Sequence, residues 1–336
     1  MISFIVPAYN AKKTIKKCLE TLLNQKNTKL DYEIIVVDDG STDETAEIIK
    51  ERFSNALLSA KIRLYSKENG GLSSARNYGV SKASGDYYIF VDSDDFVETT
   101  LLHDIEQYIT NGIELIKWKT NITYKEAGDY LDKEQEICPT FDVCTGEEGF
   151  NKLFGKADLI VPVWDYAMKK NLFIEFPIGR YHEDFSVMPL VIFNAKSMVC
   201  INKFEYHYVQ TDKSIMRNNP ESEKKKIDDV LIAFDELIKK TDEYYTITEE
   251  VKPEEKLSDI MNEKFDQDSK KLALCKKTKE NAKIFYTYSL LEPYKNMSGD
   301  NKDYFLKEIK KRKVGKYIKV RGPKSLIKKI LISIKY

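Results

Sequence analysis

Four short runs of apolar and β-branched residues dominate the first third of the chain, and each is followed by a turn and a segment with helical spacing. The runs cover residues 2–6, 33–37, 61–65 and 87–91. Apolar strands that alternate with helices predict a parallel sheet buried on both faces. The chain is therefore expected to be an α/β protein, with a Rossmann-like, mostly parallel central sheet and flanking helices. Such sheets bind ligands outside the carboxyl ends of their strands.

Polar residues follow each run, where that rule places a ligand. The four turns are Pro7-Ala8-Tyr9-Asn10, Asp38-Asp39-Gly40-Ser41, Glu68-Asn69-Gly70-Gly71 and Asp92-Ser93-Asp94-Asp95. Because these turns end neighbouring strands, they are expected to converge on one carboxylate-rich crevice. The residues from Ser41 to Glu44 also match a capping box, which predicts a helix that begins at Ser41.

Asp92 and Asp94 are separated by one residue, so on a continuing strand both would face the same side. Their oxygens suit one divalent cation that also touches a diphosphate. The alternative is a solvated acidic turn, because an isolated Asp-x-Asp is common. Arg76 is either a bidentate partner of a diphosphate or a surface arginine. Asp39 either accepts hydrogen bonds from a base or ribose or belongs to an N-cap cluster.

Three later residues, in two segments, are also candidates for chemistry. Glu183 and Asp184 come just before a helical pattern that runs to about Phe193. A carboxylate there is either a general base for an acceptor hydroxyl or only a partner of the helix dipole, and spacing alone leaves both open. His207 lies in a β-like run, where a lone histidine is more often structural than a ligand.

The rest of the chain is less regular and then helical. The polar stretch 124–136 predicts a surface excursion, a helix is expected near 147–154, and two short β-like runs follow at 198–201 and 204–209. Lys/Glu-rich helical segments begin near residue 220. The predicted domains are an α/β domain over 1–218, a helical region over 219–306 and a basic amphipathic tail over 307–336.

In this order and spacing, the motifs of the four turns resemble the family 2 inverting glycosyltransferases with a GT-A fold, of the bacterial polysaccharide and cell-wall glycan type. The four motifs are residues 5–10, 36–43, 69–77 and 90–95. Glu183-Asp184 after Trp164, and Tyr206-His207-Tyr208 before Ser214, extend the resemblance to about residue 217.

The resemblance implies a metal-dependent transfer of a hexosyl or N-acetylhexosaminyl group. The donor is a nucleotide sugar, usually UDP-linked, and the acceptor is a hydroxyl of a glycan, a lipid-linked oligosaccharide or a wall polymer. Asp184 matches the general base, and Glu183 supports it or contacts the acceptor. The positions matching donor contacts are Pro7, Ala8, Tyr9, Asp39, Asn69, Arg76, Asp92 and Ser214. The positions matching ligands of Mn²⁺ or Mg²⁺ are Asp92, Asp94 and His207.

Charge is balanced over the chain, with 54 basic and 54 acidic residues, but it is segregated. Residues 307–336 hold twelve Lys or Arg and a single acid, and the last part of this tail projects as an amphipathic helix. Such a helix is expected to bind anionic lipid, and the alternative is a helix docked on its own domain. A nucleic-acid partner is not expected, because the tail lacks aromatic stacking platforms.

Location follows from the cysteines and the termini. Five widely spaced cysteines without a Cys-x-x-Cys pair suit a reducing compartment. The N-terminus lacks the features of a signal peptide, and no run is long and apolar enough to span a bilayer. We therefore expect a cytoplasmic protein, peripheral on the inner face of the plasma membrane.

Two other functions share a nucleotide crevice. A sugar nucleotidyltransferase is disfavoured because the first turn lacks the Gly-rich, Lys-containing loop that handles triphosphates. A catalytically silent glycan-binding subunit is disfavoured because Asp92, Asp94 and Asp184 are all present.

Overall fold

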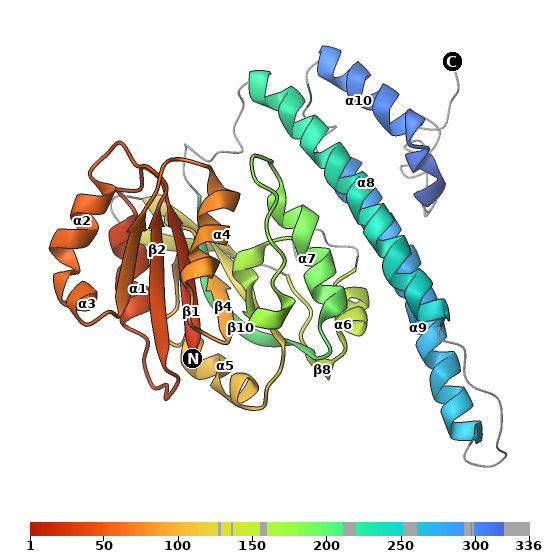
Figure 1. The fold of residues 1–336 in the computed structure, drawn as a ribbon, viewed down its shortest axis with the longest axis horizontal. Coiled ribbons are helices and arrows are strands. Elements are labelled where there is room, and N and C mark those ends of the chain that lie inside the picture. Colours follow the sequence, from red (N-terminus) through yellow and green to blue (C-terminus); the bar gives the residue numbers. More distant parts are fainter. Residues whose placement is uncertain are drawn as a thin grey trace. The chain divides into compact units, whose positions relative to one another are not determined.

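The computed structural model describes residues 1–126, 129–135, 137–154, 160–210, 220–250, 261–291, 297 and 299–318. The chain separates into two compact units, one of residues 1–149 and 162–217 and the other of residues 150–161 and 218–336. The first unit carries the sheet, and the second is built mainly from long helices (Figure 1).

A ten-stranded sheet forms the first unit. One half is parallel and has the order β3 (Ile62–Ser66), β2 (Tyr32–Asp38), β1 (Ile2–Ala8) and β4 (Tyr87–Phe90). The other half is mixed and consists of β9 (Tyr166–Lys169), β6 (Leu115–Glu126), β10 (Met198–Gln210) and β5 (Phe96–Val97), with β7 (Asp129–Gln135) beside β6 and β8 (Phe141–Cys144) beside β10. The predicted α/β architecture is confirmed, and the carboxyl ends of the four parallel strands share one edge.

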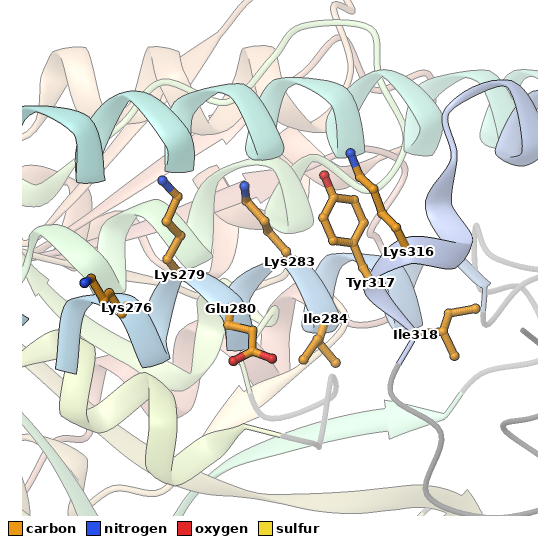
Figure 2. A pocket seen from close by; sticks show the side chains of 8 residues that line it. All are labelled: Lys276, Lys279, Glu280, Lys283, Ile284, Lys316, Tyr317 and Ile318. Carbon is orange, nitrogen blue, oxygen red and sulfur yellow. The ribbon is translucent and has the colours of Figure 1, made fainter. Parts of the chain in front are cut away.

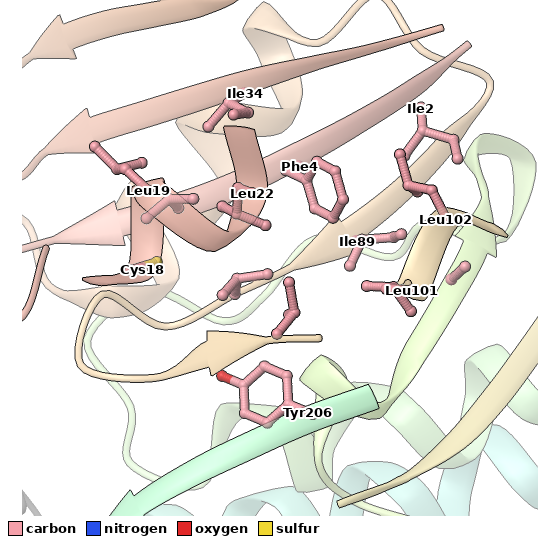
Figure 3. Close-up of a cluster of buried hydrophobic side chains, with 14 of the residues drawn as sticks. Ile2, Phe4, Cys18, Leu19, Leu22, Ile34, Ile89, Leu101, Leu102 and Tyr206 are labelled. Atoms are coloured by element: carbon pink, nitrogen blue, oxygen red, sulfur yellow. The ribbon is translucent and has the colours of Figure 1, made fainter. Parts of the chain in front are cut away.

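Helices cover both faces of the sheet. They are α1 (Ile15–Leu23), α2 (Thr45–Arg52), α3 (Ser54–Leu58), α4 (Leu72–Lys82), α5 (Leu101–Thr110) and α7 (Glu183–Asn194). Helix α6 (Gly146–Leu153) begins in the first unit and ends in the second. Phe4, Ile34 and Ile89, which lie in register on β1, β2 and β4, point into the core with α1 and α5 (Figure 3). On the opposite face, α4 packs closely because Gly79 has no side chain: a Cβ there would lie 2.6 Å from Cγ2 of Ile5. Burial on both faces explains why the strands are apolar throughout.

The predicted capping box is wrong. Helix α2 begins at Thr45, and its preceding residue Glu44 makes no side-chain cap. Instead, the Thr45 amide donates to Oδ1 of Asp43 at 3.0 Å, while the Ser41 hydroxyl accepts from the Asn10 amide at 3.0 Å. Ser41 is used to join two loops rather than to begin a helix.

The structure also describes two predicted segments in the middle of the chain. In the polar stretch 124–136, predicted as a surface excursion, β6 continues and pairs antiparallel with β7. The two β-like runs after residue 198 form one strand, β10, whose register against β6 shifts around Phe204. Polar residues on the solvated side of such a strand interrupt its apolar run, so the strand is difficult to recognise from the sequence.

The second unit contains α8 (Pro220–Glu250), α9 (Met261–Leu291), α10 (Gly299–Lys311) and the short 3₁₀ helix η5 (Val314–Tyr317). Among the described residues, no helix is both long and apolar enough to cross a membrane. Ser214 and the amphipathic part of the predicted tail, after residue 318, lie outside the described residues.

Candidate active site

The loops after β1 and β2 are joined at the edge where the parallel strands end. Oδ1 of Asn10 accepts a hydrogen bond from the Thr42 amide at 2.8 Å, in addition to the bond between Asn10 and Ser41. Pro7 and Ala8 are buried in β1, whereas Tyr9, directly after the strand, is 52% exposed. Of the three positions that resemble a base-binding turn, Tyr9 is the one with a large side chain facing solvent.

Asp39 is buried and bound by the loop that follows β3. Its Oδ1 lies 2.6 Å from Nζ of Lys67, and its Oδ2 accepts from the Gly71 amide at 2.7 Å. Gly40 makes this approach possible, since φ is +72° and a Cβ would lie 2.8 Å from the Asn69 amide. Asp39 therefore orders the glycine loop, and the side chain of Asn69 remains exposed beside it.

Arg76 joins three carboxylates that are far apart in the sequence. Its Nη1 lies 2.7 Å from Oε1 of Glu183 and 2.8 Å from Oδ1 of Asp184, and its Nη2 lies 2.9 Å from Oδ1 of Asp92. The arginine is 0% exposed, so the surface-arginine alternative is excluded. The solvated-turn alternative for Asp92 is excluded by the same ion pair. One buried guanidinium therefore fixes residues from the end of β4 and the start of α7.

Negative charge exceeds positive charge in this cluster. Burial raises the pKa of Asp184 to about 8, Arg76 opposes that rise, and the charges of Glu183 and Asp92 add to it. Within the part of the chain that the structure describes, the hydrogen bond of Oδ2 of Asp184 is a long one, 3.4 Å from the Val163 amide. A carboxylate with a raised pKa and a weakly bound oxygen is suited to accept a proton.

Asp92 and Asp94 lie in a turn after β4 rather than on a continuing strand, so the predicted strand alternation does not apply to them. Oδ1 of Asp92 is held by Arg76, and the side chain of Asp94 is exposed. Because the neighbouring cluster has excess negative charge, the remaining oxygens of these residues fit a hard divalent cation. No group of three or more metal-binding side chains is assembled among the described residues.

Tyr206 links the Asp92 turn to β10. Its hydroxyl donates to Oδ2 of Asp95 at 2.7 Å and accepts from the Asp92 amide at 3.2 Å. Oδ1 of Asp95 accepts from the Val209 amide at 2.7 Å. Asp95, which sequence reasoning did not select, thus anchors the turn through a buried carboxylate.

His207 points to the other side of β10 and is held by two carboxylates. Its Nε2 lies 2.9 Å from Glu98, its Nδ1 lies 3.0 Å from Asp132, and its ring stacks on Phe96. The hydrogen bond from His207 lowers the pKa of Glu98. A ring nitrogen binds a metal through a free lone pair, so His207 must leave one carboxylate before it ligates a cation. Spacing offered no indication of Glu98 or Asp132, because Glu98 follows β5 and Asp132 lies on β7, and only the pairing of the sheet brings both to His207 of β10.

Comparisons with known proteins agree with this arrangement. Residues 3–141 match the model of the glycosyl transferase family 2. The chain is 31% identical over 230 residues to glycosyltransferase GlyG of Streptococcus pneumoniae, covering 65% of this chain and 73% of that protein. It is 29% identical over 223 residues to glycosyltransferase GlyA of the same organism, covering 62% of this chain but only 30% of GlyA.

The fold is also similar to that of a TarS fragment from S. aureus crystallised with UDP-GlcNAc. The TM-score is 0.64 at 18% identity, over 94% of this chain and 80% of the fragment. The fold therefore defines a GT-A-type α/β protein. The chain belongs to glycosyl transferase family 2, as the motifs in its sequence predict.

A separate hollow of about 320 Å³ lies within the second unit, between α9 and η5. Figure 2 shows Lys279, Lys283, Lys316 and the Tyr317 hydroxyl on one side of it, and Glu280 turned the other way. Asp242 of α8 lies 2.5 Å from Nζ of Lys283 and 3.2 Å from Nζ of Lys279. Lysines outnumber acids in this lining, so the hollow favours anions.

Proposed function

We propose that this glycosyltransferase moves a sugar from a nucleotide-linked donor, UDP-linked by preference, to a hydroxyl of a glycan, a lipid-linked oligosaccharide or a wall polymer. The observation that carries the proposal is the Arg76 cluster, which brings the expected base Asp184 to the Asp92 turn. TarS, which was crystallised with UDP-GlcNAc, supports the donor class through its shared fold. Residues 1–218 are the catalytic domain in this proposal.

Asp184 acts as the general base. It removes the proton of the acceptor hydroxyl while that oxygen forms a bond to the anomeric carbon, and the nucleoside diphosphate leaves from the opposite side with the bonding electron pair. A single displacement of this kind inverts the anomeric centre. Glu183 and Asp184 both accept from Nη1 of Arg76. Glu183 therefore competes with the base for this donor and weakens the interaction between Arg76 and Asp184.

Asp92 and Asp94 would hold Mn²⁺ or Mg²⁺. When bound, such a cation neutralises charge that develops on the departing diphosphate. The excess carboxylate charge around Arg76 supports this assignment, since one guanidinium faces three acids. His207 is a further ligand only after its ring leaves Glu98 or Asp132.

Tyr9 and Asn69 contact the donor with their exposed side chains. Pro7, Ala8 and Asp39 are buried beneath them and shape the donor site. Asp39 does so through the glycine loop that it binds. Ser214 contacts the phosphates. Arg76 acts mainly by positioning the carboxylates, because both of its terminal nitrogens are already bonded to them.

The C-terminal region binds an anionic membrane surface. Its tail over 307–336 has twelve basic residues and one acid. The lysine-lined hollow supports this partner because Lys276, Lys279 and Lys283 of α9 line it together with Lys316 of the tail. The enzyme is then a peripheral protein of the inner face of the plasma membrane.

A panel of nucleotide sugars tests the function. With Mn²⁺ or Mg²⁺ present, the wild-type protein should release nucleoside diphosphate from one of them when a glycan acceptor is added. Release of pyrophosphate would instead indicate a nucleotidyltransferase, and no release would indicate a silent binding subunit. D184N should abolish transfer while UDP still binds; full turnover by this variant would remove Asp184 from the role of base.

A further inference from the structure

Trp164 lies at the centre of η2 (Val163–Asp165), a short 3₁₀ helix in the first unit. Asp165, the residue after it, is fixed because its Oδ2 lies 2.9 Å from Nζ of the buried Lys117. The amide of Val163, the residue before it, points to Oδ2 of Asp184 at 3.4 Å. The backbone of Trp164 is thus held beside the proposed base. Its indole is only partly buried.

Two tyrosines of β10 support the indole. The ring centroids of Trp164 and Tyr208 are 5.6 Å apart with planes at 15°, and those of Trp164 and Tyr206 are 6.0 Å apart at 24°. Tyr206 and Tyr208 are alternate residues of one strand, so they project from the same face of the sheet. Tyr206 also bonds the Asp92 amide and Asp95. The indole is therefore braced against the same tyrosine that holds the Asp92 turn.

The indole lacks a polar partner within the described part of the chain. No hydrogen bond of its Nε1–H is found there, although a tryptophan that serves only the core usually satisfies this donor or is fully enclosed. The residue before Trp164 contacts Asp184 through its amide, and Tyr206, on which the indole stacks, bonds the Asp92 amide, so an apolar aromatic plane is linked to polar groups on both sides. That combination is typical of a small-molecule site.

We propose that Trp164 is the platform on which a pyranose ring of the acceptor stacks, so that its hydroxyl lies beside Asp184. This inference rests on the proposed function and narrows the acceptor class. A pyranose presents a face of C–H groups that packs on an aromatic plane, whereas an acyclic polyol phosphate does not. The acceptor terminus is therefore a cyclic sugar, and its contact with Trp164 is apolar rather than ionic.

Intrinsic fluorescence tests the platform without any turnover. The chain has two tryptophans, and the other one, Trp118, is 0% exposed, so a ligand-induced change reports mainly on Trp164. The probes are disaccharides that end in glucose, galactose, N-acetylglucosamine or N-acetylgalactosamine, compared with ribitol phosphate and glycerol phosphate. A saturable change with at least one disaccharide, lost in W164F, is expected. No change with any disaccharide, or a change with the polyol phosphates alone, would overturn the proposal.

Kinetics separate this proposal from the proposed function. W164A should raise the acceptor KM about tenfold and leave the donor KM within about twofold, because stacking energy is lost only on the acceptor side. W164F should fall between W164A and the wild type. Tyr32→Ala is the matched control, since Tyr32 is a partly buried aromatic at the opposite end of β2 and should leave the acceptor KM unchanged. If W164A leaves the acceptor KM unchanged while D184N is inactive, the stacking role of Trp164 is rejected and the proposed function stands. If the wild-type protein releases no nucleoside diphosphate, the proposed function itself is rejected.

Discussion

Nη1 of Arg76 lies 2.8 Å from Oδ1 of Asp184, and the two residues are 108 positions apart in the chain. The arginine belongs to α4, which packs on the parallel half of the sheet, and the aspartate belongs to the first turn of α7. Their ion pair joins the parallel half of the sheet, where the sequence resembles a donor site, to Asp184, the residue expected to act on the acceptor. Stability and catalysis should therefore both depend on it.

Replacing Arg76 by Gln should destabilise the first unit strongly. Three carboxylates would lose their shared cation in a buried site, and breaking a buried ion pair from one side costs about 3 to 5 kcal/mol. Denaturant unfolding followed by circular dichroism measures the change. Arg52→Gln is the control, because Arg52 is exposed on α2 and should shift the unfolding free energy by no more than about 0.5 kcal/mol. Equal shifts for the two variants would show that the cluster does not stabilise the fold.

The pH dependence of kcat/KM should have its acidic limb well above the ordinary range of a carboxyl group. Asp184 must be ionised to accept a proton, and burial raises its pKa to about 8. The rate should therefore rise with increasing pH through this region and fall as the carboxylate is protonated. Initial rates between pH 5.5 and 9.5 at low substrate concentration measure the limb. A rate already at its maximum at pH 6 would contradict a base with a raised pKa.

Removing divalent cations should abolish nucleoside diphosphate release, and Mn²⁺ or Mg²⁺ should restore it. Asp94→Asn should raise the cation concentration that gives half-maximal rate by at least about tenfold, because one anionic oxygen ligand is lost. Asp31→Asn is the control, since Asp31 is an exposed aspartate just before β2. Activity that survives chelation would eliminate the cation from the reaction.

Deleting residues 319–336 should release the protein from vesicles that contain phosphatidylglycerol. Each basic residue near an anionic surface contributes about 1 kcal/mol, and added salt should weaken binding of the full chain. Co-sedimentation with these vesicles and with phosphatidylcholine vesicles measures the effect. The deletion leaves α10 and η5 in place, so nucleotide binding should persist. Full retention of the truncated protein on anionic vesicles would contradict the tail as the anchor.

The parallel half of the sheet could be predicted from the sequence because its information is local. Strands that are buried on both faces must be apolar along their whole length, and residues such as Ile5 and Ile35 satisfy that requirement. The mixed half of the sheet is more difficult to predict from the sequence. The hairpin of β6 and β7 is polar, and β10 is interrupted by a register shift, so neither has a clean alternating pattern.

The candidate site was predictable to a similar extent. Asp92, Asp94 and Asp184 could be selected as chemical groups, because each occupies a recognisable position after a strand or before a helix. The residues that hold the rest of the site could not be selected in this way. Lys67, which pairs with Asp39, Asp95, which bonds Tyr206, and Glu98 and Asp132, which hold His207, are identified only when distant segments meet, since contacts between distant segments leave no periodic pattern along the chain.

By itself, the sequence determined the α/β class, the family and the carboxylates at the strand ends, because buried strands and turns depend on residues that are close together in the sequence. Only the tertiary structure decided what those groups do to one another. It buried Arg76 among three acids, enclosed His207 between two carboxylates and brought Val163, the neighbour of Trp164, to Asp184. The physical reason is that pKa values, ion pairs and stacking depend on distance through space, which topology sets after the local elements have formed.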